Sequence, residues 1–372
     1  MTILICIPCL LTGGTEIQTL NLVQSLVMSG HRVITVCYFE YSLEIVSRFQ
    51  HAGSEVICLS KDGIRIGSWK GIIFLYKGLR KILKQYRPEV AHVQYMAPGA
   101  IPILLLHLLG MHQIIATAHT AADIYPNLRL VHFVQQHCVR AFTCITELAE
   151  RSFFGTSQLY SEKTLLKKRN HFTIYNALPA GISISQQAKK QDQPLTIGVV
   201  SRLESIKGMD LVVSAFEQVK ACHSKMQLLI VGDGSLRKQM EVQVHNAGLE
   251  KAVEFAGRQP QEKLSSYYDR IDILLMPSRS EGFGLTAIEG MAHGCVVVAS
   301  RTGGLPEVVR DGEVGLLHEP EQVKDLVTQI NKLIEQPALW KQFSNNASTY
   351  VQRFRFNRFC QLFNNLYQKI EN

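Results

Sequence analysis

Short apolar runs alternate with stretches whose apolar positions recur at helical spacing, from one end of the chain to the other. Short continuous apolar runs are typical of buried parallel strands, and the periodic stretches between them are typical of connecting helices. The pattern predicts an α/β protein with parallel sheets wound by helices. The expected strands are 3–7, 32–38, 55–59, 90–94, 114–118, 141–145, 172–175, 196–200, 227–231, 253–255, 271–276, 296–299 and 315–317.

The length of 372 residues exceeds one ordinary core and suits two α/β domains. Residues 179–194 are rich in Gln, Ser, Ala and Lys and show little periodicity, so we expect an interdomain linker there. The halves do not repeat each other residue by residue. We therefore predict two separately built Rossmann-like domains, 1–180 and 181–354, whose parallel sheets face each other across a cleft.

Charge and cysteine usage narrow the class of protein. The formal net charge of +8 is mild, and no helix-turn-helix, zinc-finger or aromatic RNA-binding pattern is present, so no nucleic-acid partner is expected. The nine cysteines lie mostly within apolar strand-like runs, which indicates reduced thiols in a cytoplasmic protein. The first residues lack the basic leader of a signal peptide.

Two segments need weighing against a membrane. Residues 100–118 are largely apolar, but Pro102 and Gly110 interrupt them, and a helix to Leu109 followed by a strand from Ile114 is the favoured interpretation. The basic series 65–87 lies on a helical pattern with apolar residues. A solvated helix face and a surface that rests on an anionic membrane both remain open for it.

Two acidic residues, Glu281 and Glu289, frame a glycine-bearing turn after the apolar run 271–276. Apolar positions recur at helical spacing from Leu285 onward, so we expect a helix that begins near Gly284. Such a helix presents unpaired backbone amides and the positive end of its dipole to an anion, which predicts a phosphate site. Glu289, about one turn into the helix, has two oxygens for the hydroxyls of a ribose. Glu281 would face whatever the phosphate carries.

A cationic loop follows the expected strand 196–200. Arg202 offers a planar fork and Lys207 a point charge at the start of a helix, which together suit a diphosphate. Two solvated loop cations are the alternative. The loop with Gly13 and Gly14 follows the first strand and opens a helix; it is a phosphate-type loop, or a structural turn without a ligand.

These motifs, with the run Gly303-Gly304-Leu305-Pro306-Glu307, resemble the donor site of glycosyltransferase family 4. That family comprises retaining enzymes with the GT-B fold, and the resemblance implies that the final helix, about 355–372, joins the first domain. It also implies a donor site that includes Gly13, Gly14, Arg202, Lys207, Gly232, Arg258, Phe283, Gly284, Leu285 and Glu289. Arg258 either stacks on the base or is solvated.

The resemblance further implies that Glu281 orients the sugar hydroxyls and that His119, after strand 114–118, contacts the donor sugar. Both are therefore the candidate catalytic residues. Relatives commonly have His-Asp at this place, whereas this chain has His119 followed by Thr120. That departure puts any acidic role at the second position in doubt.

The expected activity is transfer of a hexose-type sugar from a nucleoside diphosphate sugar, with UDP favoured, to a glycan or lipid-linked acceptor. Cell-surface polysaccharide or lipopolysaccharide synthesis is the usual setting of such relatives. No Asp-x-Asp pair is present to hold Mg²⁺ or Mn²⁺, so we expect no metal and no other cofactor. A catalytically silent nucleotide-sugar binder is the alternative. A nicotinamide dehydrogenase would need a fingerprint loop that this sequence lacks.

Overall fold

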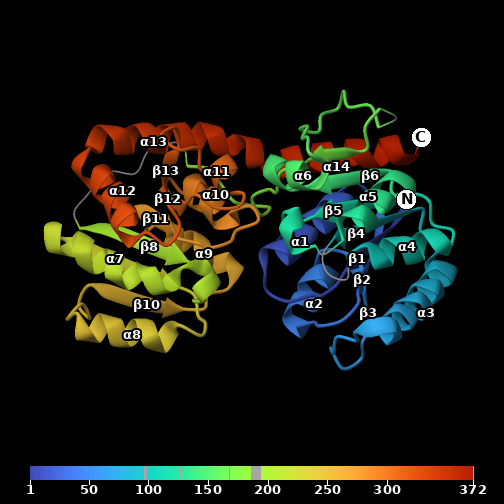
Figure 1. The fold of residues 1–372 in the computed structure, drawn as a ribbon, viewed down its shortest axis with the longest axis horizontal. Coiled ribbons are helices and arrows are strands. Elements are labelled where there is room, and N and C mark those ends of the chain that lie inside the picture. The colour runs from blue at the N-terminus through green and yellow to red at the C-terminus, as the bar shows by residue number, and fades with distance from the viewer. Residues whose placement is uncertain (96–98, 126, 167, 186–193, 372) are drawn as a thin grey trace. The chain divides into compact units, whose positions relative to one another are not determined.

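The computed structural model describes residues 1–95, 99–125, 127–166, 168–185 and 194–371. The chain forms two compact units, one made of Met1–Ala180 with Phe356–Asn372 and one of Gly181–Arg355. Each unit is a parallel sheet with helices on its faces (Figure 1). Residues 186–193 of the predicted linker lie outside the described residues.

The sheet of the first unit has seven parallel strands in the order β3-β2-β1-β4-β5-β6-β7. The strands are β1 (Thr2–Ile7), β2 (Arg32–Cys37), β3 (Ser54–Cys58), β4 (Val90–Tyr95), β5 (Ile114–Ala118), β6 (Ala141–Cys144) and β7 (His171–Thr173). All seven were predicted to within a residue or two. Because β2 and β4 flank β1 on opposite sides, the strand order reverses beside β1, and ligands bind at such a switch point in open α/β sheets.

Helices cover both faces of this sheet. They are α1 (Gly14–Met28), α2 (Leu43–His51), α3 (Ser68–Tyr86), α4 (Ala100–Leu108), α5 (Leu128–His137), α6 (Glu147–Phe154), α14 (Phe356–Glu371) and the short η1 (Ala122–Ile124). The apolar stretch at 100–118 forms α4 and β5, as expected. Within the described part of the chain, no helix combines the length and hydropathy that crossing a bilayer requires.

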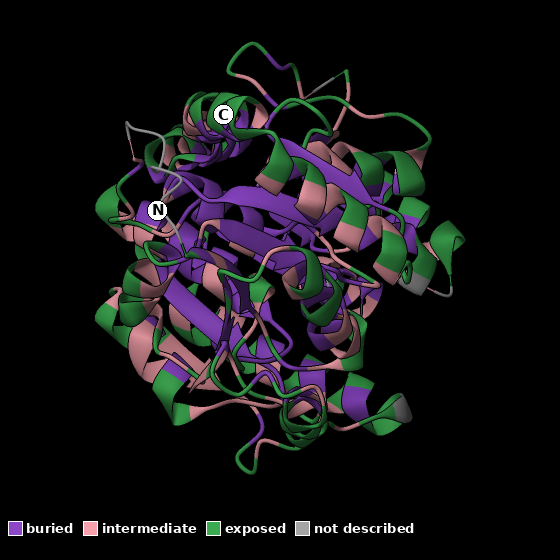
Figure 2. Ribbon diagram, turned by 90° about the vertical axis from the view of Figure 1, so that its left-hand side faces the viewer, coloured by how far each residue is buried: buried purple, intermediate pink, exposed green. Residues whose placement is uncertain are grey.

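The pleat of β1 explains its unbroken apolar run. Leu4 and Cys6 join one buried cluster, whereas Ile3, Ile5 and Ile7 join the cluster on the other face of the sheet. Strands packed on both faces lie at the buried centre of the fold (Figure 2). The second cluster also contains Phe359, Phe363 and Leu366 of α14, so the last helix belongs to the core of the first unit.

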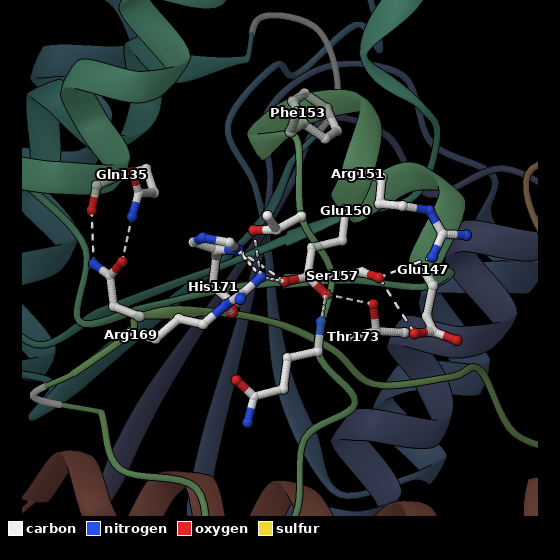
Figure 3. Close-up of polar contacts among 12 residues, drawn as sticks. Gln135, Glu147, Glu150, Arg151, Phe153, Ser157, Arg169, His171 and Thr173 are labelled. Carbon is white, nitrogen blue, oxygen red and sulfur yellow. Dashed lines mark hydrogen bonds and ion pairs between the residues drawn. The ribbon is translucent and has the colours of Figure 1, made fainter.

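A buried carboxylate fastens the edge of this sheet. Glu150 of α6 has no exposed side-chain surface and accepts hydrogen bonds from Arg169, His171 and Thr173, at 2.8, 2.8 and 2.7 Å (Figure 3). Burial would raise the pKa of Glu150, but these bonds and the amide of Gln158 lower it below its ordinary value. The edge strand β7 is thereby tied to α6.

The second unit has six parallel strands in the order β10-β9-β8-β11-β12-β13, with the switch at β8. The strands are β8 (Leu195–Val200), β9 (Met226–Val231), β10 (Val253–Gly257), β11 (Ile273–Met276), β12 (Val296–Ser300) and β13 (Gly315–His318). The helices are η2 (Ser205–Lys207), α7 (Met209–Cys222), α8 (Arg237–Asn246), α9 (Gln261–Tyr268), α10 (Leu285–Ala292), α11 (Leu305–Val308), α12 (Val323–Glu335), α13 (Pro337–Tyr350) and η3 (Val351–Phe354). Trp340 and Phe343 of α13 are buried in its core.

Candidate functional site

The predicted site residues lie in the loops that follow the carboxyl ends of strands, or in the first turns of the helices that follow these loops. In the second unit, Arg202 and Lys207 follow β8, Gly232 follows β9 and Glu281 follows β11. Strands β9 and β11 are the two neighbours of β8, so parallel strand direction gathers these loops at one edge of the sheet. This edge is the ligand-binding edge of open α/β sheets.

The loops after β8 and β11 are bonded to each other. The amide of Arg279 donates to the carbonyl of Ile206 at 3.0 Å, and the Arg279 guanidinium pairs with Asp210 at 2.6 and 2.8 Å. Gly208 has φ +67, and a Cβ at this position would overlap the carbonyl oxygen of Pro277. Only glycine fits there without displacing one loop from the other.

Lys207 and Glu281 meet across these two loops. Lys207 Nζ lies 2.7 Å from Glu281 Oε2, and the side chains are 19% and 17% exposed. The backbone of Glu281 is held from the other side, because its carbonyl accepts from the amide of Gly304 at 3.0 Å. Gly303 has φ +51 and lies against the same carbonyl, where a Cβ would overlap the oxygen. The pair therefore occupies a fixed place with limited access to solvent.

The loops after β8 and β9 are joined in the same way. Glu204 Oε2 accepts from the hydroxyl of Ser235 at 2.5 Å, and the amide of Leu203 donates to the carbonyl of Asp233 at 3.0 Å. Arg202, next to this junction, is exposed, and Gly232 packs against the loop with φ +137. Arg202 is therefore an exposed cation on a loop that hydrogen bonds hold in place, which suits the binding of an anion.

Glu289 is the fifth residue of α10, about one turn into the helix, and the residue is buried, at 5% exposure. Its oxygens accept from the Tyr268 hydroxyl at 2.7 Å and from Gln261 Nε2 at 3.1 Å. Burial raises the pKa of Glu289, and the two hydrogen bonds offset part of that rise. A carboxylate has about four acceptor positions, so these bonds leave capacity for a ligand's hydroxyls.

The remaining donor-site residues of the second unit differ in exposure. Gly284 is the N-cap of α10, and Leu285, half-buried, is its first residue. Phe283 is buried and packs edge-on against Phe354 at 5.7 Å, so its ring is part of the core. Arg258 directly follows β10 and is exposed. The first amides of α10 have no partner within the helix ladder, as at the start of any helix, and helix N-termini are a common type of anion site.

In the first unit, Gly13 is the N-cap of α1 and Gly14 is its first residue. The buried carboxylate of Glu16 folds back over this loop, since a Cβ on Gly13 would lie 2.6 Å from Glu16 Oε2. Cys9 Sγ donates to the other oxygen of Glu16 at 3.5 Å. The helix N-terminus thus already has a negative group beside it, a feature that the spacing of the glycines did not reveal.

His119 follows β5 and is buried, with Nε2 2.7 Å from the amide oxygen of Gln94. Burial lowers the pKa of His119 to about 4, so the ring is neutral at physiological pH. When Nε2 donates to Gln94, Nδ1 of the neutral ring is a hydrogen-bond acceptor, and the ring carries no charge near neutrality.

Sequence reasoning missed three residues that hold the site together, namely Gln261, Tyr268 and Arg279. Gln261 and Tyr268 are far from Glu289 in the sequence, and only the strand order brings α9 and α10 together. Arg279 lies two residues before Glu281. The sequence around it does not reveal that it pairs with Asp210, which is far away along the chain.

Comparison with known proteins extends this picture. A family model described as "Glycosyl transferases group 1" matches residues 182–350, and one described as "Glycosyltransferase Family 4" matches residues 12–154. An uncharacterized glycosyltransferase of Methanocaldococcus jannaschii is 25% identical over 366 residues, covering 96% of this chain and 95% of that protein. A D-inositol 3-phosphate glycosyltransferase of Acidothermus cellulolyticus is 35% identical over 167 residues, 42% of this chain and 37% of the relative.

Two solved structures have the same fold over nearly the whole chain. HepE of Anabaena in complex with UDP has a TM-score of 0.79 at 18% identity, covering 99% of this chain and 100% of that one. The lipopolysaccharide outer core galactosyltransferase WaaB has a TM-score of 0.76 at 18% identity, with the same coverage. The two Rossmann-like units therefore have the GT-B fold, as predicted.

The two family models, one matching each unit of the chain, identify the family. The chain belongs to glycosyltransferase family 4.

Proposed function

We propose that this protein is a retaining hexosyltransferase that uses a UDP-sugar donor and a hydroxyl of a glycan or lipid-linked acceptor. The setting we propose is cell-surface polysaccharide or lipopolysaccharide synthesis. The Lys207–Glu281 pair carries the proposal, because it places a cation and an acid side by side at the switch point of the second sheet. HepE, a structural neighbour, is described in complex with UDP and with UDP-glucose, which supports a UDP-sugar as donor.

In this mechanism, positive groups stabilise the departing nucleoside diphosphate. Arg202 and Lys207 supply side-chain charge, and the first amides of α10 supply a dipole. The leaving phosphate oxygen takes the proton of the acceptor hydroxyl on the same face of the sugar, so the anomeric configuration is kept. With these cations in place, we propose that transfer needs no metal.

The two acids have separate roles. Glu281 orients the sugar hydroxyls next to Lys207, and Glu289 accepts the hydroxyls of the ribose. His119 of the first unit contacts the donor sugar as a neutral imidazole, because burial keeps its pKa near 4. A charged histidine would be costly at a buried position.

A thermal-shift screen with UDP, GDP, ADP and their glucose conjugates tests the proposal, because a ligand that binds the folded state raises the melting temperature. We expect the uridine compounds to give the largest shift, and Glu289→Ala to remove it. Slow release of UDP from UDP-glucose without an acceptor would separate an enzyme from a silent binder. Binding of UDP-glucose with no turnover, alone or with glycan acceptors, would favour the silent binder.

A second part of the proposal concerns location: a cytoplasmic protein that rests on the inner face of an anionic membrane. Helix α3 contains no acidic residue, and its outward side exposes Trp69, Ile73 and Tyr76. The exposed basic residues of the same helix are Lys70, Lys77, Arg80, Lys81 and Lys84. Apolar and cationic groups together suit an interface with anionic lipid headgroups.

A further inference from the structure

The carboxylate of Glu289 is held on both oxygens by one helix. Tyr268 donates its hydroxyl to Oε2 at 2.7 Å, and Gln261 donates from Nε2 to Oε1 at 3.1 Å. These two residues are the first and last of α9 and lie on one side of it, since they are separated by about two helical turns. Helix α9 therefore presents a matched pair of donors to a single acid.

Tyr268 is itself fixed in place. Its side chain is 1% exposed, and its ring stacks on His293 with centroids 5.5 Å apart and planes 15° apart. His293 Nδ1 lies 2.8 Å from Asp269 Oδ1, and Cys295 Sγ donates to the Tyr268 carbonyl at 3.4 Å. A ring packed in this way holds its hydroxyl at Glu289 Oε2, to which it donates.

We propose that Tyr268 is a positioning residue of the nucleotide site, whose buried hydroxyl holds the carboxylate of Glu289 as the acceptor for both hydroxyls of the ribose. The inference rests on the proposed function, because it assigns Glu289 to the ribose. Tyr268 touches the acid and not the ligand. No residue pattern in the sequence pointed to it.

The physical reason lies in the burial of the acid. Burial raises the pKa of Glu289, and the hydrogen bonds from Tyr268 and Gln261 act against that rise. A protonated carboxyl turns one of its oxygens into a donor, so it can no longer accept from two hydroxyls. Nucleotide binding is therefore present above the pKa of Glu289 and is lost as the pH falls through it.

Removing the Tyr268 hydroxyl should move this loss to higher pH. A hydrogen bond to an ionised group is strong enough to shift a pKa by about one unit. The other titratable groups around the pair are Asp269, His293 and Cys295. Tyr268→Phe leaves all three in place, so a comparison with the wild type isolates the contribution of the hydroxyl.

The experiment measures the dissociation constant of UDP between pH 5 and pH 8 by calorimetry, with GDP and ADP in parallel. Tyr268→Phe is compared with Tyr267→Phe, the neighbouring, half-buried tyrosine whose ring lies 5.8 Å from the Arg270 guanidinium. Gln261→Ala, at the half-buried start of α9, is a second variant that removes the other donor. Glu289→Gln tests the acid itself, and melting curves confirm that each variant is folded.

We expect Tyr268→Phe to bind UDP like the wild type at pH 8 and about tenfold more weakly at the acid end, with the midpoint about one pH unit higher. Gln261→Ala should shift the midpoint of the pH profile in the same direction, and Tyr267→Phe should leave the midpoint unchanged. Profiles that superimpose for the wild type, Tyr268→Phe and Gln261→Ala, while Glu289→Gln binds weakly, would overturn the inference and leave the proposed function standing. If no nucleoside diphosphate binds the wild type, or if Glu289→Gln binds as the wild type does, both fall.

Discussion

Lys207 and Glu281, the cation assigned to the diphosphate and the acid assigned to the sugar, are bonded to each other at 2.7 Å. The charge of the acid thus opposes that of the cation. A bound diphosphate must therefore share Lys207 with Glu281, and the negative charge of Glu281 opposes that of the diphosphate. Glu281 should therefore weaken nucleotide binding. A role of Glu281 in turnover would explain why an acid stands at this position.

Glu281→Gln should therefore bind UDP more tightly than the wild type while its turnover falls. Loss of the opposing charge frees Lys207, and a partly screened pair is worth about 1 kcal/mol, or about fivefold in affinity. Calorimetry with UDP and steady-state turnover of UDP-glucose measure the two effects. Glu319→Gln, an exposed acid paired with Arg301, removes the same charge elsewhere on the unit and should change neither. Weaker UDP binding by Glu281→Gln would contradict the assignment.

Gly208→Ala should damage the same site through the backbone. The new Cβ would overlap the Pro277 carbonyl and push the loop of Lys207 away from the loop of Glu281. We expect the free energy of unfolding to fall by about 2 kcal/mol or more, together with weaker UDP binding. Denaturant unfolding and calorimetry measure these quantities.

Gly248→Ala is the matched control for that substitution. Gly248 also has a positive φ, of +63, and lies in the same unit, but its Cβ would meet no atom within 4 Å. This variant should lose about 1 kcal/mol from the backbone conformation alone and keep UDP affinity. Equal effects from the two alanines would show that the contact of Gly208 with Pro277 has no special importance.

The regular elements could be predicted because their signals are local. Most strands are short apolar runs buried on both faces, as Ile3 and Leu4 of β1 illustrate by joining opposite clusters. Turn residues mark where these runs end. The glycines and acids of 281–289 likewise lie close together in sequence. All thirteen predicted strands were confirmed for that reason.

The contacts that make the site work have no local signal. Glu289 is bonded to Tyr268 of α9, and Lys207 is bonded to Glu281 at a separation of 74 residues. Such pairs arise from the order of strands in the sheet, which hydrophobic periodicity does not encode. Burial was equally hidden, because nothing in the sequence showed that the ring of Phe283, a predicted donor-site residue, packs against Phe354.

Metal removal should leave the activity unchanged. In the proposed mechanism Arg202, Lys207 and the amides of α10 supply all the positive charge that the diphosphate needs, and the sequence contains no Asp-x-Asp pair. Turnover of UDP-glucose in excess EDTA should equal turnover in buffer. Lys207→Ala should lower turnover in both conditions. Loss of activity in EDTA, restored by Mg²⁺ or Mn²⁺, would overturn metal-independent transfer.

Substitutions on α3 should weaken binding to anionic vesicles. Each basic residue near such a surface contributes about 1 kcal/mol, so Lys77→Gln with Lys81→Gln should reduce partitioning about thirtyfold. Sedimentation with phosphatidylglycerol vesicles at low salt measures this, with phosphatidylcholine vesicles as the uncharged comparison. Leu43→Ala, which trims another exposed apolar side chain, should have no effect. Failure of the wild type to sediment with the anionic vesicles would contradict the membrane proposal.

The buried acid Glu150 should make the first unit sensitive to acid. Its folded-state pKa lies below the ordinary value of 4.5, so the ionised form stabilises the fold above that pH, and this contribution is lost as the pH falls through the folded pKa. Glu150→Gln removes the charge that Arg169 and His171 contact, which should cost about 3 kcal/mol at pH 7. Melting temperatures from pH 7 to pH 3 should converge for the two proteins at the acid end.

Glu147→Gln, on the same helix, is the control. This variant should cost less than about 1 kcal/mol, because the hydroxyls of Ser157 and Tyr175 donate to Glu147 over longer distances, 3.3 Å each. A constant difference between wild type and Glu150→Gln down to pH 3 would mean that the pKa of Glu150 is the same in the folded and the unfolded protein, and it would contradict the prediction.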